Sequence, residues 1–262
     1  MKLVTLTTDW GTSDFFAGMV KGRLYSLIPD VQVVDITHDI ESYNLVKAAF
    51  ILKNSCFNFP EGTIHIIDVD TYENKDCPYL VVECEKQYYI CADNGIPTSL
   101  FRNKQVNITQ ISMFQDSSFY TFPAYNLFCL VAARLAEGVP MEEIGFAGSK
   151  LKTVACMKPL VHNDWIEADV MYVDSYGNAY LNILYDDFAK ILNGRRMWIT
   201  IGVLVHKEVT ISDSYFDTID YGEYGFALTV SATGYLELAL LHASAEELLG
   251  ATLGQKVIIQ FS

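Results

Sequence analysis

The sequence lacks the features that mark several common classes of protein. No run reaches the ~18 apolar residues that a membrane-spanning helix needs. No opening stretch pairs a basic segment with a long apolar one, and Asp9 interrupts the first apolar segment, so we expect no secretory signal and a soluble, cytoplasmic protein. Only 18 of the 262 residues are basic against 32 acidic, which leaves a net charge of −14. Because nucleic-acid binding rests mainly on lysine and arginine neutralising phosphates, we expect no nucleic-acid partner.

The signatures of common enzymes are also missing. The sequence has no Gly-x-Ser-x-Gly elbow, Walker loop or Gly-x-Gly-x-x-Gly, which removes support for the usual hydrolase, kinase and dehydrogenase interpretations. Its five histidines show no metal-ligand spacing, so we interpret them as structural and expect no metal. Six cysteines form no Cys-x-x-Cys pair and read as buried hydrophobes, with Cys77 the one that we expect to react first because its neighbours are polar: Cys56, Cys77, Cys84, Cys91, Cys129 and Cys156.

What the sequence does contain is a folded-protein composition with an alternating pattern in its first half. Hydrophobic residues make up 51% and charged residues 19%, as expected of a large core. Strand-like segments at 2–8, 31–37, 63–70, 79–84 and 88–92 alternate with helix-like segments at 13–28, 43–56 and 122–137. This order predicts the α/β class, with a mostly parallel, sandwich-like N-terminal domain over residues 1–155.

The second half follows a different pattern. Short strands are expected at 166–173, 179–184, 196–203, 226–230 and 235–241, with one short helix near 244–249. We therefore predict a smaller, mainly β domain over residues 156–262, with the boundary inside the lysine-rich stretch 148–163.

Acidic residues gather where the first strands end. In open α/β sheets ligands bind beyond the carboxyl ends of the strands, and Asp9 and Asp70 end the first and third strands there. Asp9 is either a turn residue or an acceptor for a diol such as a ribose. Asp14 is more simply explained as part of a helix cap with Thr12 or Ser13.

Two further stretches are open to more than one interpretation. Asp68 and Asp70 are two apart in a strand-like segment, so we expect them to point the same way and either bind a metal or share a proton. The stretch "VDSYGNAYLN" offers an acid, an aromatic ring and two asparagines to a polar ligand. It is equally compatible with an ordinary β-turn.

Several of these stretches together resemble the fluorinase, chlorinase and S-adenosylmethionine hydroxide adenosyltransferase superfamily. The segments are "TTDWGTSDFFAGMVKGRLYSLIPDVQVVDITHDI", "FPEGTIHIIDVD", "ADNGIPTSL", "LVAARLAEG", "VDSYGNAYLNI" and "TGYLELALLHASAEELLG", in family order over nearly all the chain. The resemblance implies an α/β domain, a C-terminal β-barrel-like domain, and a homotrimer with sites between neighbouring subunits. S-adenosylmethionine would be the substrate, with no cofactor.

The resemblance also implies roles for individual residues. Asp9 matches the acid that holds the ribose hydroxyls, and Asp174 matches the acid that contacts the methionine ammonium. The other matching positions are Tyr43 beside the ribose, Tyr176 and Asn178 at the adenine, Ala232 and Thr233 at the methionine carboxylate, and the backbone around Leu240 and His242 at the adenine edge.

The sequence departs from the family where the nucleophile would sit. Asp70 matches the acid of an Asp, Arg and His set proposed to activate water, but Cys77 and Pro123 replace the other two. Asp70 also occupies the position of a halide-lining tyrosine, and Ala124 that of a halide-contacting serine. Since a carboxylate repels a halide, water is the favoured nucleophile, with Asp70 acting alone or helped by Lys75, Glu73 or Tyr125.

Three functions fit these observations. The first is hydrolysis of S-adenosylmethionine to adenosine and L-methionine, because a sulfonium is activated before the protein acts. The second is a catalytically weak or silent protein that binds S-adenosylmethionine or adenosine, which the changes at Cys77 and Pro123 favour. The third is transfer from another 5′-activated adenosine, with the loop at 72–78 shaping the partner.

Overall fold

The described residues form two compact units, Met1–Ala155 and Cys156–Ser262. The computed structural model describes residues 2–115, 118, 120–148, 150–154, 158–221 and 224–262. Each unit has its own hydrophobic core, so each is described by itself. Cys156, interpreted above as a buried hydrophobe, lies outside the described residues.

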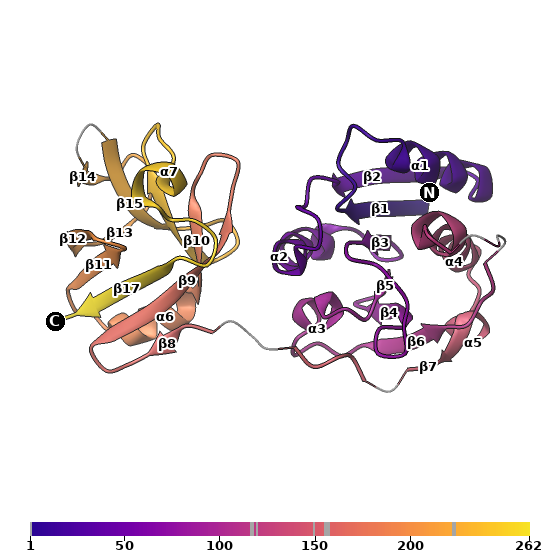
Figure 1. The fold of residues 1–262 in the computed structure, drawn as a ribbon. Helices are drawn as coiled ribbons and strands as arrows, with labels where there is room; N and C mark the ends of the chain where they lie inside the picture. The colour runs from indigo at the N-terminus through magenta and orange to yellow at the C-terminus, as the bar shows by residue number, and fades with distance from the viewer. Residues whose placement is uncertain (1, 116–117, 119, 149, 155–157, 222–223) are drawn as a thin grey trace. The chain divides into compact units, whose positions relative to one another are not determined.

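A seven-stranded sheet with helices on both faces makes up the N-terminal unit (Figure 1). The strand order is β2-β1-β3-β5-β4-β6-β7, in which β2, β1, β3 and β5 run parallel. The strands are β1 (Lys2–Thr8), β2 (Val31–Thr37), β3 (Ile64–Asp68), β4 (Tyr79–Cys84), β5 (Gln87–Ala92), β6 (Asn107–Ile111) and β7 (Gly145–Ala147).

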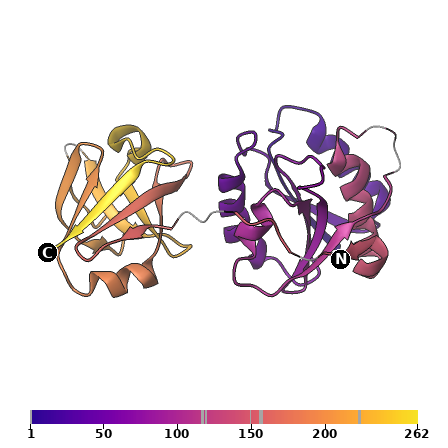
Figure 2. The ribbon, with the colours of Figure 1, turned by 60° about the horizontal axis from the view of Figure 1, so that its bottom comes forward.

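The helices cover the two faces because each strand alternates its side chains between them. Figure 2 shows the sheet between two helical layers. One layer contains α1 (Phe16–Leu27), η2 (Ala124–Phe128), α4 (Cys129–Ala136) and α5 (Met141–Ile144), and the other contains α2 (Leu45–Ser55), η1 (Cys56–Asn58) and α3 (Ile96–Leu100). Val4 and Leu6 pack with the first layer, whereas Ile67 and Tyr89 pack with the second.

A nearly closed, barrel-like sheet makes up the C-terminal unit. Its main strand order is β12-β11-β17-β9-β10-β16-β15-β13, with β14 paired to β15 and β8 paired to β9. The elements are β8 (Leu160–Val161), β9 (Trp165–Val173), β10 (Ala179–Leu184), α6 (Tyr185–Leu192), β11 (Met197–Ile201), β12 (Leu204–Val209), β13 (Ile211–Ser212), β14 (Ile219–Tyr221), β15 (Tyr224–Val230), β16 (Tyr235–Leu240), α7 (Ala245–Leu249) and β17 (Lys256–Phe261). The predicted fold class is confirmed.

The structure corrects the expected start of the first helix. Helix α1 begins at Phe16, and Phe15 at its N-cap makes no side-chain capping bond. The proposed cap by Thr12 or Ser13 with Asp14 is therefore wrong, because the chain makes bends rather than helix over these residues.

Several elements were not expected from the sequence. They include β6, β7, α6 and β17, and also β12, which begins where the strand expected at 196–203 was predicted to end. Strand β7, for example, has only three residues, too few to show a period.

Candidate active site

The acids of the N-terminal unit meet at the carboxyl edge of its parallel strands. Asp9 follows β1, Asp68 ends β3, and Asn94 lies two residues beyond β5. Because β1, β3 and β5 are parallel neighbours, their carboxyl ends open onto one edge of the sheet. This is the edge where ligands bind in open α/β sheets.

Asp9 ties the loops of this edge together. Its Oδ2 accepts hydrogen bonds from the backbone N–H groups of Tyr43, at 3.1 Å, and Asp70, at 3.3 Å. Both donors have left-handed backbones, with φ of 69° at Tyr43 and 47° at Asp70. Such conformations are unfavourable for non-glycine residues and persist where the surroundings require them. Among the described residues no hydrogen bond reaches Asp9 Oδ1, which leaves that oxygen available to a ligand hydroxyl.

The strand alternation expected to align Asp68 with Asp70 does not apply, because Asp70 lies beyond the end of β3. Strand β3 ends at Asp68, and the left-handed turn at Asp70 breaks the two-residue alternation. Asp68 is buried and accepts a 2.8 Å hydrogen bond from Trp10 Nε1. Burial raises the pKa of the Asp68 carboxyl to about 7, and the charge of Asp9 adds to the rise.

Asp70 is joined to Asp9 by its backbone N–H, and the charge of the Asp9 carboxylate acts on the Asp70 carboxyl. Burial raises the pKa of the Asp70 carboxyl, and the Asp9 charge raises it further. The positive charge of Lys152 opposes this rise. A carboxylate whose pKa is raised is a stronger base than an ordinary carboxylate, which suits a group that takes a proton.

Asn94 supports the Asp70 loop from the neighbouring strand, a role that the sequence interpretation missed. Its Nδ2 donates to the carbonyls of Val69, at 2.8 Å, and Asp70, at 3.2 Å. Its Oδ1 accepts from the backbone N–H of Ile96 at 3.2 Å. The quoted segment "ADNGIPTSL" contains Asn94, and the position of an amide after a strand was the available signal.

Two of the positions that differ from the family pattern, Cys77 and Ala124, lie in the apolar core of the N-terminal unit. Cys77 is only 2% exposed, and burial raises the pKa of its thiol. It is therefore not the readily reactive cysteine that its polar neighbours in sequence indicated. Tyr125 lies under the Arg23 guanidinium, 4.4 Å from its ring centroid. The positive charge that acts on Asp70 is that of Lys152, which was not among the possible helpers Lys75, Glu73 and Tyr125.

In the C-terminal unit, Asp174 organises the turn between β9 and β10. Its Oδ1 accepts from the backbone N–H groups of Tyr176, at 2.9 Å, and Asn178, at 3.0 Å. Its Oδ2 lies 3.3 Å from both Asn178 Nδ2 and the Tyr180 hydroxyl. The Tyr176 ring is 80% exposed. The turn thus presents a fixed carboxylate beside an exposed aromatic ring.

The remaining predicted positions lie near the two ends of β16. Thr233 Oγ1 is hydrogen-bonded to Ser231 Oγ at 2.9 Å, and Ala232 between them is exposed. At the other end Leu240 is buried and pairs with Ala243, and the exposed His242 has a φ of 58°.

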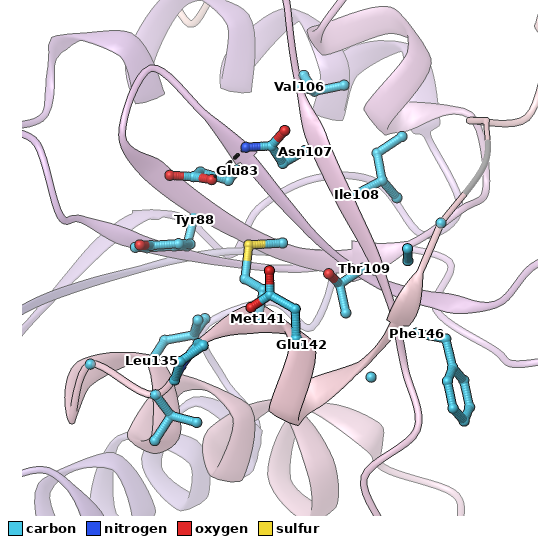
Figure 3. A pocket seen from close by; sticks show the side chains of 16 residues that line it. Glu83, Tyr88, Val106, Asn107, Ile108, Thr109, Leu135, Met141, Glu142 and Phe146 are labelled. Carbon is cyan, nitrogen blue, oxygen red and sulfur yellow. Dashed lines mark hydrogen bonds between the residues drawn. The ribbon is translucent and has the colours of Figure 1, made fainter.

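A cavity of the N-terminal unit lies away from these acids. It has a volume of about 730 Å³ and is bordered by β6, β7, the end of α4 and α5 (Figure 3). Its lining includes Tyr88 at the amino end of β5, so it opens at the edge opposite Asp9. Glu83 is hydrogen-bonded to Asn107 there, at 2.8 Å, and both polar and apolar side chains line the cavity around them. We place the candidate site by the acids, because they carry the chemistry.

Two absences apply to the described part of the chain. Within it, no group of three or more His, Cys, Asp or Glu side chains is placed to hold a metal ion. None of its helices combines the length and the apolar character that crossing a membrane requires.

Comparison with known proteins assigns the chain to a family. The model of the SAM hydroxide adenosyltransferase N-terminal domain matches residues 4–145, and that of the C-terminal domain matches residues 168–258. The chain belongs to the SAM hydroxide adenosyltransferase family. The resemblance seen in the sequence is thereby confirmed.

Relatives of this chain match nearly its whole length. An (R)-S-adenosyl-L-methionine hydrolase of Methanocaldococcus jannaschii is 24% identical over 261 residues, covering 95% of this chain and 92% of the relative. One of Salinispora tropica is 26% identical, covering 97% and 96%. A fluorinase of Nocardia brasiliensis is 24% identical, covering 92% and 91%. An uncharacterised protein of Thermotoga maritima has a similar solved structure, with a TM-score of 0.87, 26% identity, and 98% and 99% coverage.

Proposed function

We propose that this SAM hydroxide adenosyltransferase family member hydrolyses S-adenosylmethionine at C5′ to give adenosine and L-methionine. The observation that carries the proposal is the Asp9 carboxylate, which holds the loops after β2 and β3 together beside Asp70. The relatives named (R)-S-adenosyl-L-methionine hydrolase support it, because they match almost the entire chain.

The reaction is a displacement at carbon. A water oxygen forms a bond to C5′ as the C5′–S bond breaks, and the electron pair of that bond neutralises the sulfonium to give the methionine thioether. The water loses one proton, for which Asp70 is the proposed acceptor. The protein must hold water and C5′ in line. Because the leaving group is already activated, we propose no cofactor.

The proposed roles of the remaining residues follow the family resemblance. Asp9 and Tyr43 hold the ribose, and Asp174 receives the ammonium of the substrate. Adenine lies against Tyr176, Asn178 and the backbone at Leu240 and His242, and the carboxylate lies at Ala232 and Thr233. The proposed assembly is a cytoplasmic homotrimer in which two subunits complete each site.

Water is favoured over halide by the charge at Asp70. A carboxylate about 4 Å from a halide repels it by ~4 kcal/mol at an effective dielectric constant near 20.

The test is to incubate the purified protein with S-adenosylmethionine in H₂¹⁸O and to follow products by liquid chromatography and mass spectrometry. We expect equal amounts of adenosine and methionine, with ¹⁸O in the 5′-hydroxyl. Asp70→Asn should slow turnover while adenosine affinity is kept. Asp39→Asn is the matched control, because Asp39 is an exposed acid following β2 at the same edge.

Binding is tested separately. Asp9→Ala should weaken adenosine binding by about 10- to 100-fold, because a hydrogen bond to a charged group is worth ~1.5–3 kcal/mol. Tight binding of S-adenosylmethionine without product would replace the hydrolase proposal by that of a binding protein, which the buried Cys77 in place of an arginine favours. Failure to bind either ligand would overturn both.

A further inference from the structure

A second cavity of the N-terminal unit lies where the loop at 72–78 meets the start of the lysine-rich stretch at 148–163. It has a volume of about 420 Å³, a size that small-molecule sites commonly have. Strands β4 and β6 contribute Leu80 and Gln110 to its lining. Three lysines also line it, one from the loop and two from the lysine-rich stretch: Lys75, Lys150 and Lys152.

The three lysines have no acidic partner. Within the described part of the chain, no ion pair joins Lys75, Lys150 or Lys152 to a carboxylate, and all three side chains are exposed. Four other lysines of the same unit each pair with an acid: Lys21, Lys47, Lys86 and Lys104. The ammonium groups at the cavity are therefore available to an anion.

Two aspartates line the same cavity, and neither forms an ion pair with these lysines. Asp93 is buried, and its Oδ1 and Oδ2 each accept a 3.0 Å hydrogen bond from the backbone N–H of Lys152. Asp76 is exposed in the loop beside Lys75. Three positive charges thus face two negative ones, of which one is already held by the backbone. The balance favours an anion, in a chain whose net charge is −14.

Hydrogen bonds hold the backbone on both sides of the cavity. In the loop, the N–H of Asn74 donates to the Cys77 carbonyl at 3.3 Å, and the N–H of Cys77 donates to the Asn74 carbonyl at 3.1 Å, which closes a turn around Lys75. On the other side, the Thr98 hydroxyl donates to the carbonyl of Lys152, whose N–H is held as described above. An anion then needs to order only the lysine side chains, which lowers the cost of binding.

We propose that this cavity binds the di- or triphosphate group of a small molecule through Lys75, Lys150 and Lys152. Lysine ammonium groups act as compact charges toward phosphate oxygens, and three of them suit a group that carries several negative charges. The net charge of the chain opposes a nucleic acid, so the ligand is a small molecule. Neither Asp9 nor Asp70 lines the cavity, and the inference does not rest on the proposed hydrolysis.

The test titrates the unmodified full-length protein with inorganic pyrophosphate and tripolyphosphate by calorimetry, without divalent cations. We expect a single site with a Kd below about 1 mM. Binding should weaken as NaCl is raised from about 50 to 500 mM, because salt screens exposed charges. No heat of binding, or an affinity that salt does not change, would overturn the inference. Citrate is the comparison with carboxylates, and tighter binding of citrate would overturn the assignment to phosphate.

A parallel titration with saturating adenosine separates this cavity from the proposed active site. The inorganic probes carry no nucleoside, so their affinity should be unchanged by adenosine. Displacement of pyrophosphate by adenosine would place the probe at the nucleoside site and overturn the inference. Pyrophosphate binding in a protein that releases no adenosine from S-adenosylmethionine would overturn the proposed function alone.

Variants locate the binding. Lys150→Gln and Lys152→Gln should each weaken pyrophosphate binding about tenfold or more, and both keep the backbone hydrogen bonds. Lys86→Gln is the matched control, because it removes the same charge from an exposed lysine that lies between β4 and β5 and pairs with Glu61. Its affinity should equal that of the wild type. Unchanged binding in Lys152→Gln, or equal weakening in Lys86→Gln, would refute a site at the cavity.

Discussion

Replacing Asp68 by asparagine should stabilise the N-terminal unit, by an amount that grows with pH. The Asp68 carboxyl is buried, with a pKa raised from 3.8 to about 7. The unfolded chain therefore releases this proton at lower pH than the folded chain does. The free energy of unfolding of the wild type therefore falls as pH rises from 3.8 to about 7, and the loss is complete above pH 7.

The magnitude follows from the width of that window. A shift of about three pKa units corresponds to ~4 kcal/mol at 1.36 kcal/mol per unit. The asparagine of the variant has no charge to bury, and its side-chain oxygen can still accept the hydrogen bond from Trp10 Nε1. The difference in free energy of unfolding between Asp68→Asn and the wild type should therefore increase by up to about 4 kcal/mol between pH 4 and pH 8.

The assay is urea unfolding at several pH values, with hydrogen exchange of the β1 and β3 amides to report the N-terminal unit. The matched control is Asp30→Asn, an exposed aspartate in a turn whose φ of 59° asparagine also tolerates. The difference in free energy of unfolding between Asp30→Asn and the wild type should not change with pH. A flat difference for Asp68→Asn as well would show that Asp68 is ionised at little cost, and would refute the reasoning.

Three further predictions concern other parts of the molecule. A Cβ at Gly177, whose φ is 80°, would overlap Ser244 Oγ, whereas Gly194 has a similar φ of 75° and no neighbour within 4 Å. Gly177→Ala should therefore lower the free energy of unfolding by about 1–3 kcal/mol more than Gly194→Ala does. Equal thermal stability of the two variants would contradict this. Burial lowers the pKa of His65 from 6.5 to about 4, so its ring resonances should titrate near pH 4. The free energy of unfolding should contain a contribution of up to ~3 kcal/mol from the neutral ring above pH 6.5, and this contribution should be lost as pH falls to 4. A ring titrating near 6.5 would show that it is not buried. In a Cys156→Ser variant a thiol reagent should modify no cysteine before unfolding, because the five described cysteines are buried; rapid labelling at Cys77 would contradict its burial.

Much of the fold could be predicted from local pattern. The strands β1, β2, β4 and β10 have the bounds expected from the sequence, because each is an apolar run ended by a change of period or a turn residue. The fold class and the family also followed from the sequence, since their signals lie in contiguous segments. Asp9 was identified as a candidate because strand ends in parallel sheets share an edge.

Only the tertiary structure decided which of these groups act together. Asp70 lies beyond the strand that ends at Asp68, and its left-handed backbone donates to Asp9, a contact 61 residues away in sequence. The charge of Lys152 acts on Asp70, and the Tyr215 hydroxyl donates to Glu237, from positions that no local period connects. The sequence alone determined where strands end and which acids follow them, since both depend on neighbouring residues. Burial, charge coupling and the pKa of each acid depend on segments distant in the chain, so only the folded structure determines them.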